Sequence, residues 1–170
     1  MMNLEVEDFT LPAQLDLEDK WILSKYNTLV AEVTENIDKY ELGIAFDGDG
    51  DRLGIIDNAG NYMDANSILV MLYYYLHEYR GWKGPVVRNL ATTHMLDRVA
   101  ESFGEVCYEV PVGFKYISSK IDEADAVLGG ESSGGLTVRG HIHGKDSIYA
   151  ASLFVEMVCA TGKTPAEFWA

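Results

Sequence analysis

The sequence predicts an α/β domain with a mixed, partly parallel sheet, and three observations support this fold class. From residue 41 onward, short apolar segments typical of buried strands alternate with amphipathic segments of about a dozen residues, typical of helices. The composition, 48% hydrophobic and 24% charged in 170 residues, is that of one globular domain with or without an appendage. There is no run of about 18 apolar residues, so we expect no membrane span.

The chain before residue 41 predicts an N-terminal helical extension. Residues 15–40 carry one apolar stripe at three- and four-residue steps, and Asp16 suits the N-cap position. Residues 1–14 show no periodicity. Because the composition shifts once, near residue 41, we divide the chain into residues 1–41 and 42–170. The stripe consists of Ile22, Tyr26, Leu29, Val33, Ile37 and Tyr40.

The elements after residue 41 follow one another as strands and helices. Asn58 to Gly60 supplies turn chemistry, and Gly81 and Gly104 are expected to end helices. Strands are expected at "LGIAF", "RLGIID", "PVVRNL", "VCYEVPV", "DAVLGG" and "GLTVRG". Helices are expected at "NSILVMLYYYLHEYRG", "TTHMLDRVAESFG", "FKYISSKIDEA" and "DSIYAASLFVEMVCATG", the last capped by Asp146 or Ser147.

The C-terminal segment "TPAEFWA" predicts the start of another helix. Thr164 is placed as N-cap, Pro165 as first helical residue and Glu167 as capping-box partner. The sequence stops within about two turns of this start. We therefore expect the chain to be a domain taken from something longer.

Charge and cysteine content bound the possible partners and the compartment. The 27 acidic and 13 basic residues give a net charge of −14, which disfavours nonspecific binding to nucleic acid or to an anionic membrane. A small anionic substrate in a local pocket remains compatible with this charge. Cys107 and Cys159 lie far apart in apolar segments and are expected to be buried, reduced thiols. Without a signal-peptide pattern at its start, the protein is expected to be cytoplasmic.

The stretch "FDGDGDRLGIID" places Asp47, Asp49 and Asp51 on alternate positions with glycine between them. In a tight loop such residues converge, and converging carboxylates suit Mg²⁺, with Mn²⁺ or Ca²⁺ as alternatives. A solvated acidic turn is the other interpretation. An EF-hand calcium loop is excluded, because Arg52 stands where that loop needs glycine and Asn58 where it needs a bidentate glutamate.

Arg52 has two interpretations that the sequence leaves open. It could neutralise the three neighbouring carboxylates. Alternatively, its guanidinium could contact an anionic group bound to the metal, because the planar fork matches phosphate oxygens. Carboxylates and a substrate phosphate together are a usual way of holding Mg²⁺ in phosphoryl transfer.

Three further segments are candidates for a binding site. In "GGESSGG", Glu131, Ser132 and Ser133 offer groups that can read sugar hydroxyls, although such a glycine-rich segment often only turns the chain. In "VGFKYI", Lys115 precedes or begins a helix and, taken alone, is expected to be solvated. The two histidines of "HIHGKDS" have no third ligand nearby, so a loop is favoured over a zinc site.

Taken together, "GIAFDGDGDRLGIID", "VGFKYI", "GGESSGG" and "GKDS" resemble the α-D-phosphohexomutases, the phosphoglucomutases and phosphomannomutases, over residues 42–170. The resemblance implies an α/β/α layered mixed sheet like the third domain of that family, here with an N-terminal helical extension. It also implies Mg²⁺ as cofactor and a hexose phosphate, glucose or mannose phosphate, as substrate. The implied roles are metal ligands for Asp47, Asp49 and Asp51, a phosphoryl contact for Arg52, sugar hydroxyl contacts for Glu131 and Ser133, and places near the ligand for Lys115 and Thr93.

The sequence also departs from that family. The family's phosphoserine loop, of the form T-A-S-H-N-P, is not found in these 170 residues, and neither is its arginine–serine–threonine phosphate clamp. Ser147 stands where the family usually has glycine after "KD". Because the family transfers phosphoryl groups within its substrate through that phosphoserine, we expect no turnover from this chain alone.

Residues 1–45 resemble a different family, the valyl-tRNA synthetases, in "DKWILSK" and "ELGIA". The chain therefore looks like a chimera, natural or constructed, although one acidic helix does not warrant an expectation of tRNA binding. An alternative to a phosphohexomutase fragment is a non-catalytic folded chimera or oligomerisation module. We expect a homo-oligomer that uses the helix at 16–40 or the C-terminal helix.

Overall fold

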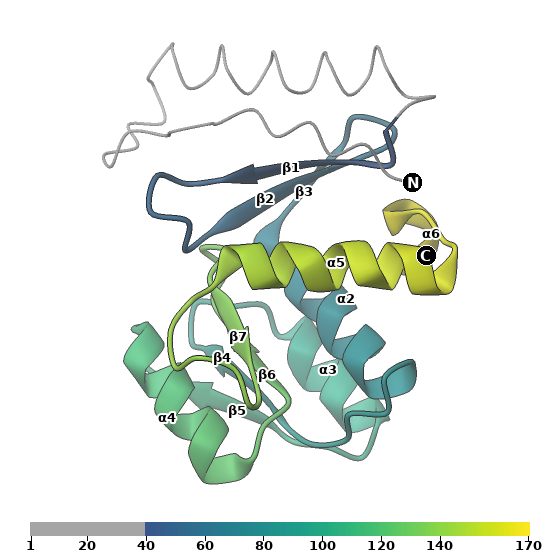
Figure 1. Cartoon of the computed structure of the whole chain (residues 1–170). Helices are drawn as coiled ribbons and strands as arrows, with labels where there is room; N and C mark the ends of the chain where they lie inside the picture. The colour runs from purple at the N-terminus through teal and green to yellow at the C-terminus, as the bar shows by residue number, and fades with distance from the viewer. Residues whose placement is uncertain (1–39) are drawn as a thin grey trace.

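The computed structural model describes residues 40–170 (Figure 1). The predicted helix at 15–40 and the synthetase-like segment therefore lie outside the described residues, apart from their last few positions. The described chain contains two sheets rather than one. A three-stranded antiparallel sheet has the order β1-β2-β3, and a four-stranded mixed sheet has the order β5-β4-β6-β7.

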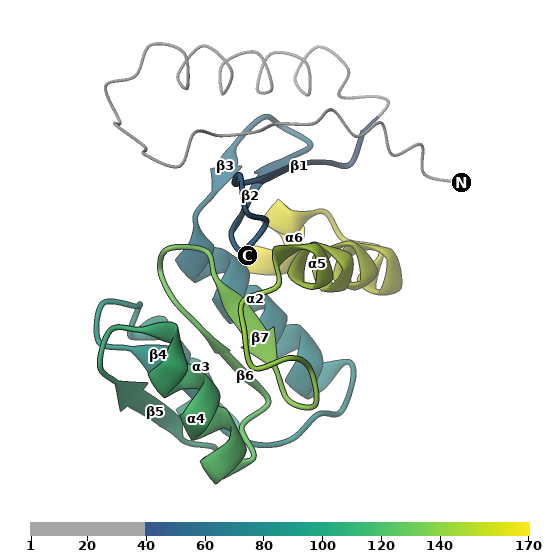
Figure 2. The same cartoon turned by 60° about the vertical axis from the view of Figure 1, so that its left-hand side comes forward.

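The small sheet consists of β1 (Leu42–Phe46), β2 (Leu53–Asp57) and β3 (Tyr62–Met63). Strands β1 and β2 form a hairpin whose last pair is Phe46 with Leu53. We call the residues between them, 47–52, the aspartate loop. Alternate apolar side chains of this hairpin pack against the main core, as strand periodicity requires. Figures 1 and 2 both place α5 (Ser147–Thr161) between the small sheet and the rest of the described chain.

The larger sheet confirms the predicted mixed, partly parallel arrangement. Strand β4 (Val86–Asn89) pairs in parallel with β5 (Cys107–Val110) and β6 (Leu128–Gly130), and β7 (Leu136–Val138) pairs antiparallel to β6. Two core clusters show that helices cover both faces of this sheet. The larger core cluster includes residues of α2 (Ala65–Glu78), α3 (Met95–Ser102) and α5, and the smaller one includes residues of α4 (Phe114–Ala124).

Gly129 and Gly130 lie in strand β6, as the predicted strand "DAVLGG" requires. A methyl group on Gly129 would overlap Ile117 and Ile121 of α4, and one on Gly130 would overlap Leu69 of α2. The two helices therefore approach the strand from opposite faces at neighbouring positions. Glycine is required here because the packing leaves no room for a Cβ.

Several predicted boundaries differ from the structure by a few residues. Helix α2 ends at Glu78, before Gly81, because the N–H groups of Arg80 and Trp82 bond back to the carbonyls of Tyr75 and Leu76. Gly81 then turns the chain with a φ of +68°. The capping box at Thr164 and Glu167 is confirmed and begins α6 (Pro165–Trp169).

The expectation of two buried thiols is wrong. Cys159 is exposed, since it lies in the last turn of α5 on the side that faces away from the core. Cys107 is half-buried, since β5 is the outermost strand of its sheet. An apolar segment does not reveal which of its positions faces the core. Of the helices in residues 40–170, none has the length and apolar character needed to cross a membrane.

Asp64 caps α2 and makes a testable contribution to stability. It accepts hydrogen bonds from the backbone N–H groups of Asn66 and Ser67 and from the Ser67 hydroxyl. Partial burial acts to raise the pKa of Asp64, but these hydrogen bonds outweigh it and hold the pKa below its ordinary value. The carboxylate therefore stabilises the fold above its unfolded-state pKa of about 3.9, and this contribution is lost as the pH falls through the lower folded-state value.

We expect Asp64→Ala to lower the free energy of unfolding at neutral pH by about 1 kcal/mol, as for loss of other N-caps. The difference from the wild type should shrink below pH ~4, because the wild-type carboxylate is then being protonated. Denaturant unfolding at several pH values measures both effects. Asp64→Ser keeps an acceptor without a charge and serves as the control. A wild-type advantage that persists unchanged into strong acid would contradict the role of the carboxylate.

Candidate functional site

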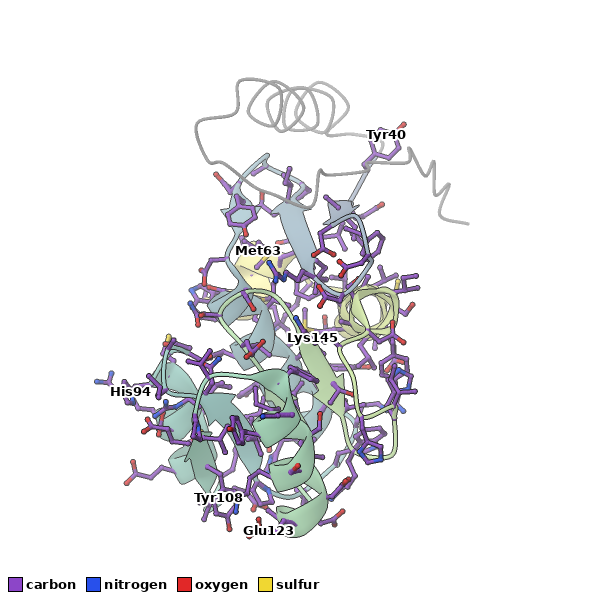
Figure 3. All side chains as sticks on the ribbon, turned by 90° about the vertical axis from the view of Figure 1, so that its left-hand side faces the viewer. Tyr40, Met63, His94, Tyr108, Glu123 and Lys145 are labelled. Atoms are coloured by element: carbon purple, nitrogen blue, oxygen red, sulfur yellow. The ribbon has the colours of Figure 1, made fainter. Side chains whose placement is uncertain are left out.

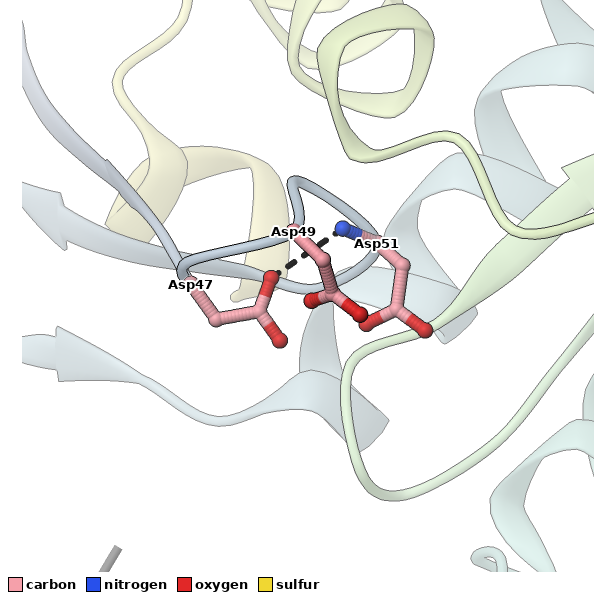
Figure 4. A group of neighbouring side chains, drawn as sticks. All are labelled: Asp47, Asp49 and Asp51. Atoms are coloured by element: carbon pink, nitrogen blue, oxygen red, sulfur yellow. Dashed lines mark hydrogen bonds between the residues drawn. The ribbon is translucent and has the colours of Figure 1, made fainter. Parts of the chain in front are cut away.

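The aspartate loop joins β1 to β2 and brings the three predicted metal ligands together. Asp47, Asp49 and Asp51 each present a carboxylate oxygen, and these three atoms lie within 4.8 Å of one another (Figure 4). Among residues 40–170 this is the only group of at least three potential ligands that converges in this way. Gly50, with a φ of +69°, allows the tight turn that the convergence needs.

One of the three carboxylates also shapes the loop. Oδ1 of Asp47 accepts hydrogen bonds from the backbone N–H groups of Asp51 and Arg52, at 3.1 and 3.0 Å. The N–H of Asp47 in turn donates to the carbonyl of Arg52. Asp47 is therefore part of the loop's own framework, whereas Asp49 is exposed at its tip.

Two cations lie beside the carboxylates. Nζ of Lys145 is 2.6 Å from Oδ2 of Asp51, and Nε of Arg52 is 3.4 Å from Oδ1 of the same residue and 3.7 Å from Oδ2 of Asp47. Figure 3 places Lys145 between the small sheet and the larger sheet. With three carboxylates and two cations, the loop keeps a net negative charge.

The pKa values of the two partly buried aspartates move in opposite directions. Burial raises the pKa of Asp47, and the charges of Asp51 and Asp49 add to this rise. Burial also acts to raise the pKa of Asp51, but the Lys145 ammonium outweighs it and holds that pKa below its ordinary value. The loop thus concentrates negative charge that Arg52 and the sequence-distant Lys145 only partly balance.

The donor set fits a hard divalent cation. Oδ1 of Asp51 is buried and accepts no hydrogen bond within the described residues, so only the ion pair with Nε of Arg52, at 3.4 Å, partly satisfies it. Such atoms are uncommon in native proteins and call for a partner. Carboxylate oxygens are the ligands that Mg²⁺ prefers. A solvated acidic turn would account for Asp49, but it does not account for the half-buried Asp47 and Asp51.

Ser147 ties the aspartate loop to helix α5. Its backbone N–H and its hydroxyl both donate to the carbonyl oxygen of Gly50, the N–H at 3.3 Å. Ser147 is the first residue of α5 and is 1% exposed. The serine found where the resembling family usually has glycine therefore adds a hydrogen bond at the turn of the loop.

The glycine-rich segment after β6 holds Glu131 at a buried position. Oε1 of Glu131 accepts a hydrogen bond from Nδ2 of Asn89 at 3.0 Å, and the hydroxyl of Ser133 lies 3.5 Å from Oε2. The segment closes on itself, because the N–H of Glu131 donates to the carbonyl of Gly135 and that of Gly134 donates to the carbonyl of Glu131. We call residues 131–135 the sugar loop, after the sugar contacts that the resemblance implies for Glu131 and Ser133.

The sugar loop touches the strand that follows the aspartate loop. Gly134 has a φ of +98°, and a Cβ there would lie 3.1 Å from the carbonyl oxygen of Leu53, the first residue of β2. The aliphatic part of Lys145 covers Gly135 and leaves no room for a Cβ there. Two segments about eighty residues apart in sequence are thus in contact.

Lys115 and Thr93 each follow a residue that contacts this region, Phe114 or Thr92, and they have other contacts of their own. Lys115 is exposed in the first turn of α4, with its ammonium 4.9 Å from the centre of the Tyr116 ring. The neighbouring ring of Phe114 lies 5.9 Å from Nζ of Lys145, which brings the start of α4 towards the aspartate loop. The hydroxyl of Thr93 accepts the N–H of Met95 at the start of α3.

Sequence reasoning missed three residues of the site: Asn89, Lys145 and Ser147. The segment "GKDS" is marked only through the family resemblance, and Lys145 carries no separate signal. The two histidines of the β7–α5 loop behave as the loop interpretation predicts. His141 pairs with Asp146 at 2.9 Å and His143 with Asp122 at 3.1 Å.

Comparison with known proteins gives a consistent result. The family model described as phosphoglucomutase/phosphomannomutase, alpha/beta/alpha domain III, matches residues 64–170. Phosphoglucomutase 1 of Drosophila melanogaster is 34% identical over 129 residues, covering 73% of this chain and 23% of that protein. The phosphoglucosamine mutase of Azotobacter vinelandii is 30% identical over 156 residues, covering 92% of this chain and 35% of that protein.

The fold is shared with solved structures as well. A protein of Thermus thermophilus assigned as a phosphomannomutase superposes with a TM-score of 0.79 at 32% identity, covering 86% of this chain and 33% of that one. The chain spans only 23% and 35% of the two curated relatives named above. The aspartate loop precedes residues 64–170, which the family model matches. The alignment with the A. vinelandii protein spans 156 residues, so it must include the aspartate loop.

Proposed function

Because this chain belongs to the phosphoglucomutase/phosphomannomutase family, we propose that residues 42–170 bind Mg²⁺ and a hexose phosphate for intramolecular phosphoryl transfer. The observation that carries the proposal is the contact between Gly134 of the sugar loop and Leu53, directly after the aspartate loop. This contact sets a metal-type donor set beside a group of sugar-type hydrogen-bonding residues. A phosphorylated sugar needs both.

Each residue has a role in this proposal. Asp47, Asp49 and Asp51 would hold Mg²⁺, and the metal when bound supplies charge neutralisation to the phosphoryl group. Arg52, whose side chain is 48% exposed, can turn its guanidinium towards phosphate oxygens while Nε stays beside the loop. Oε2 of Glu131 and the hydroxyl of Ser133 would bind sugar hydroxyls. Lys115 and Thr93 would line the approach to the site.

The names of the relatives support a hexose phosphate as ligand class, since one is a phosphoglucomutase and another a phosphoglucosamine mutase. Glucose, mannose and glucosamine phosphates are therefore the candidates. No T-A-S-H-N-P segment is found in these 170 residues. We propose that the phosphoryl donor comes from outside them, and that this chain alone does not turn over.

The origin of residues 1–41 stays a prediction. The A. vinelandii alignment covers 92% of the chain, which is more than residues 42–170 make up, so it reaches into this segment. That extension supports a mutase origin for part of it beside the proposed synthetase-like origin. A homo-oligomeric state, a cytoplasmic location and the absence of nucleic-acid and membrane partners also stay predictions.

Isothermal titration tests the proposed function. We expect the folded chain to bind Mg²⁺, and to bind glucose 1-phosphate, mannose 1-phosphate or glucosamine 6-phosphate more tightly when Mg²⁺ is present. Glu131→Gln should weaken hexose phosphate binding while Mg²⁺ binding is retained. Separate titrations with inorganic phosphate and with free glucose measure how much the phosphate group and the sugar ring each contribute to binding. Absence of binding for every sugar phosphate, from protein shown to be folded by circular dichroism, would overturn the proposal.

A further inference from the structure

Asn89 is a buried polar residue whose side chain links the turn after β4 to Glu131 of the sugar loop. It ends strand β4 and is 3% exposed, and its partner Glu131 is 7% exposed. We propose that Asn89 is a positioning residue, which sets the carboxylate of Glu131 and the backbone of the sugar loop for hexose binding. The ligand-binding part of this inference rests on the proposed function.

The hydrogen bonds of Asn89 determine which way its amide points. Oδ1 accepts the N–H of Ala91 at 3.0 Å and the hydroxyl of Thr92 at 2.8 Å. With the oxygen occupied by two donors, the NH₂ group faces Glu131 and donates to Oε1 at 3.0 Å. Each side of the amide therefore has a matching partner, and the reverse orientation would leave donors facing donors.

Thr92 extends the connection into the backbone of the sugar loop. Its hydroxyl donates to Asn89 and accepts the N–H of Ser132 at 3.0 Å. Asn89 thus reaches the Glu131 side chain directly and the next residue of the loop through one hydroxyl. Connected buried hydrogen bonds of this kind fix a geometry that a single contact would leave loose.

The two carboxylate oxygens of Glu131 have different hydrogen-bond partners. Oε1 is committed to Asn89, whereas Oε2 has only the distant Ser133 hydroxyl, at 3.5 Å. Oε2 is therefore the oxygen that remains for a sugar hydroxyl. Supporting hydrogen bonds of this kind keep a binding carboxylate in the orientation its ligand needs.

An aspartate at position 89 would test this arrangement with almost no change in size. It would keep the acceptor for Ala91 and Thr92, but it would replace the donor with an anionic oxygen facing Oε1 of Glu131. Two carboxylates at hydrogen-bonding distance repel each other or share a proton. Either response moves Glu131 or changes its charge.

The experiment compares Asn89→Asp with Asn61→Asp. Asn61 also donates its amide to a carboxylate, Asp57, at 3.1 Å, but it does so in the β2–β3 turn. We expect both variants to unfold at lower temperature than the wild type. Only Asn89→Asp should weaken hexose 1-phosphate binding, by at least about tenfold, with the Mg²⁺ dissociation constant within about twofold of wild type.

A double-mutant cycle with Glu131→Gln shows whether Asn89 acts through Glu131. If it does, Asn89→Asp should have little further effect on sugar binding once Glu131 is replaced. Equal and additive losses in both backgrounds would overturn the proposal. An unchanged sugar affinity in Asn89→Asp, from folded protein, would also overturn it.

Amide hydrogen exchange of the ligand-free protein keeps the test independent of the proposed function. Asn89→Asp should increase exchange at Ser132 and Gly134, and Asn61→Asp should not. If the wild type binds no sugar phosphate, the proposed function fails, and this exchange result still decides whether Asn89 holds the loop. Unchanged exchange at both residues would refute the positioning role.

Discussion

Replacing Asp49 with asparagine is expected to lower the affinity for Mg²⁺ at least about 100-fold, beyond the loss that removing an outer-shell partner typically causes. Asp49 is exposed at the tip of the aspartate loop, whereas Oδ1 of Asp47 makes the hydrogen bonds that shape the loop. The substitution keeps the size of the side chain and removes one of three converging charges. Isothermal titration with Mg²⁺ measures the change.

We expect Asp49→Asn to affect the free energy of unfolding differently from the Mg²⁺ affinity. Without Mg²⁺, Asp49→Asn should change the free energy of unfolding by no more than about 0.5 kcal/mol, or raise it, because like charges are relieved. Asp57→Asn is the matched control at the other end of β2, where the carboxylate accepts two backbone N–H groups of a turn. That control should lower stability and leave Mg²⁺ affinity unchanged. Equal Mg²⁺ affinity in wild type and Asp49→Asn would remove Asp49 from the metal site.

Gly130→Ala is expected to lower the free energy of unfolding by about 1–3 kcal/mol, the usual range for overpacking a core. The added methyl would overlap Leu69 of α2, which is itself 1% exposed, and would press on Cβ of Leu136 in β7. Both neighbours are themselves buried, so making room for the methyl group has to displace other core atoms. Denaturant unfolding followed by circular dichroism measures the loss.

Gly144→Ala is the control for this substitution. The closest atom to a Cβ at Gly144 is the tip of Ile142, 4.0 Å away, and the backbone there is not left-handed. Its effect on stability should be small or slightly favourable, since alanine restricts the unfolded chain. If the two alanine variants unfold at the same denaturant concentration, the close approach of α2 to β6 is not what requires glycine at position 130.

Local patterns predicted most of the individual elements. The capping box of Thr164 and Glu167 and the N-cap Asp146 of α5 depend on residues within one turn, so the sequence contains the whole signal. Strand pairing depends on residues far apart, and the antiparallel hairpin around the aspartates proved to belong to a sheet of its own. Nothing local marks Arg88, a charge that is 1% exposed in a strand and pairs with Asp97 and Glu109.

Some residues of the candidate site could likewise be predicted from local sequence, and others are brought together only by the fold. Asp47, Asp49 and Asp51 are predicted because their convergence is a property of five consecutive residues. Asn89, Lys145 and Ser147 act on partners that lie about forty to a hundred residues away, so the fold alone brings them into contact. The place of Thr93 beside the ligand comes from the resemblance and stays a prediction, while its hydroxyl accepts the N–H of Met95 at the start of α3.

The three ties between the aspartate loop and its surroundings have a consequence for ligand choice. Gly50 is held by Ser147, Asp51 by Lys145 and Leu53 by the close approach of Gly134. Under the proposed function, the metal ligands of the aspartate loop and the sugar-binding residues of the sugar loop would therefore keep a fixed spacing. On that proposal, we expect a compound whose phosphate and ring hydroxyls are spaced for a sugar of a different size to bind through one end only.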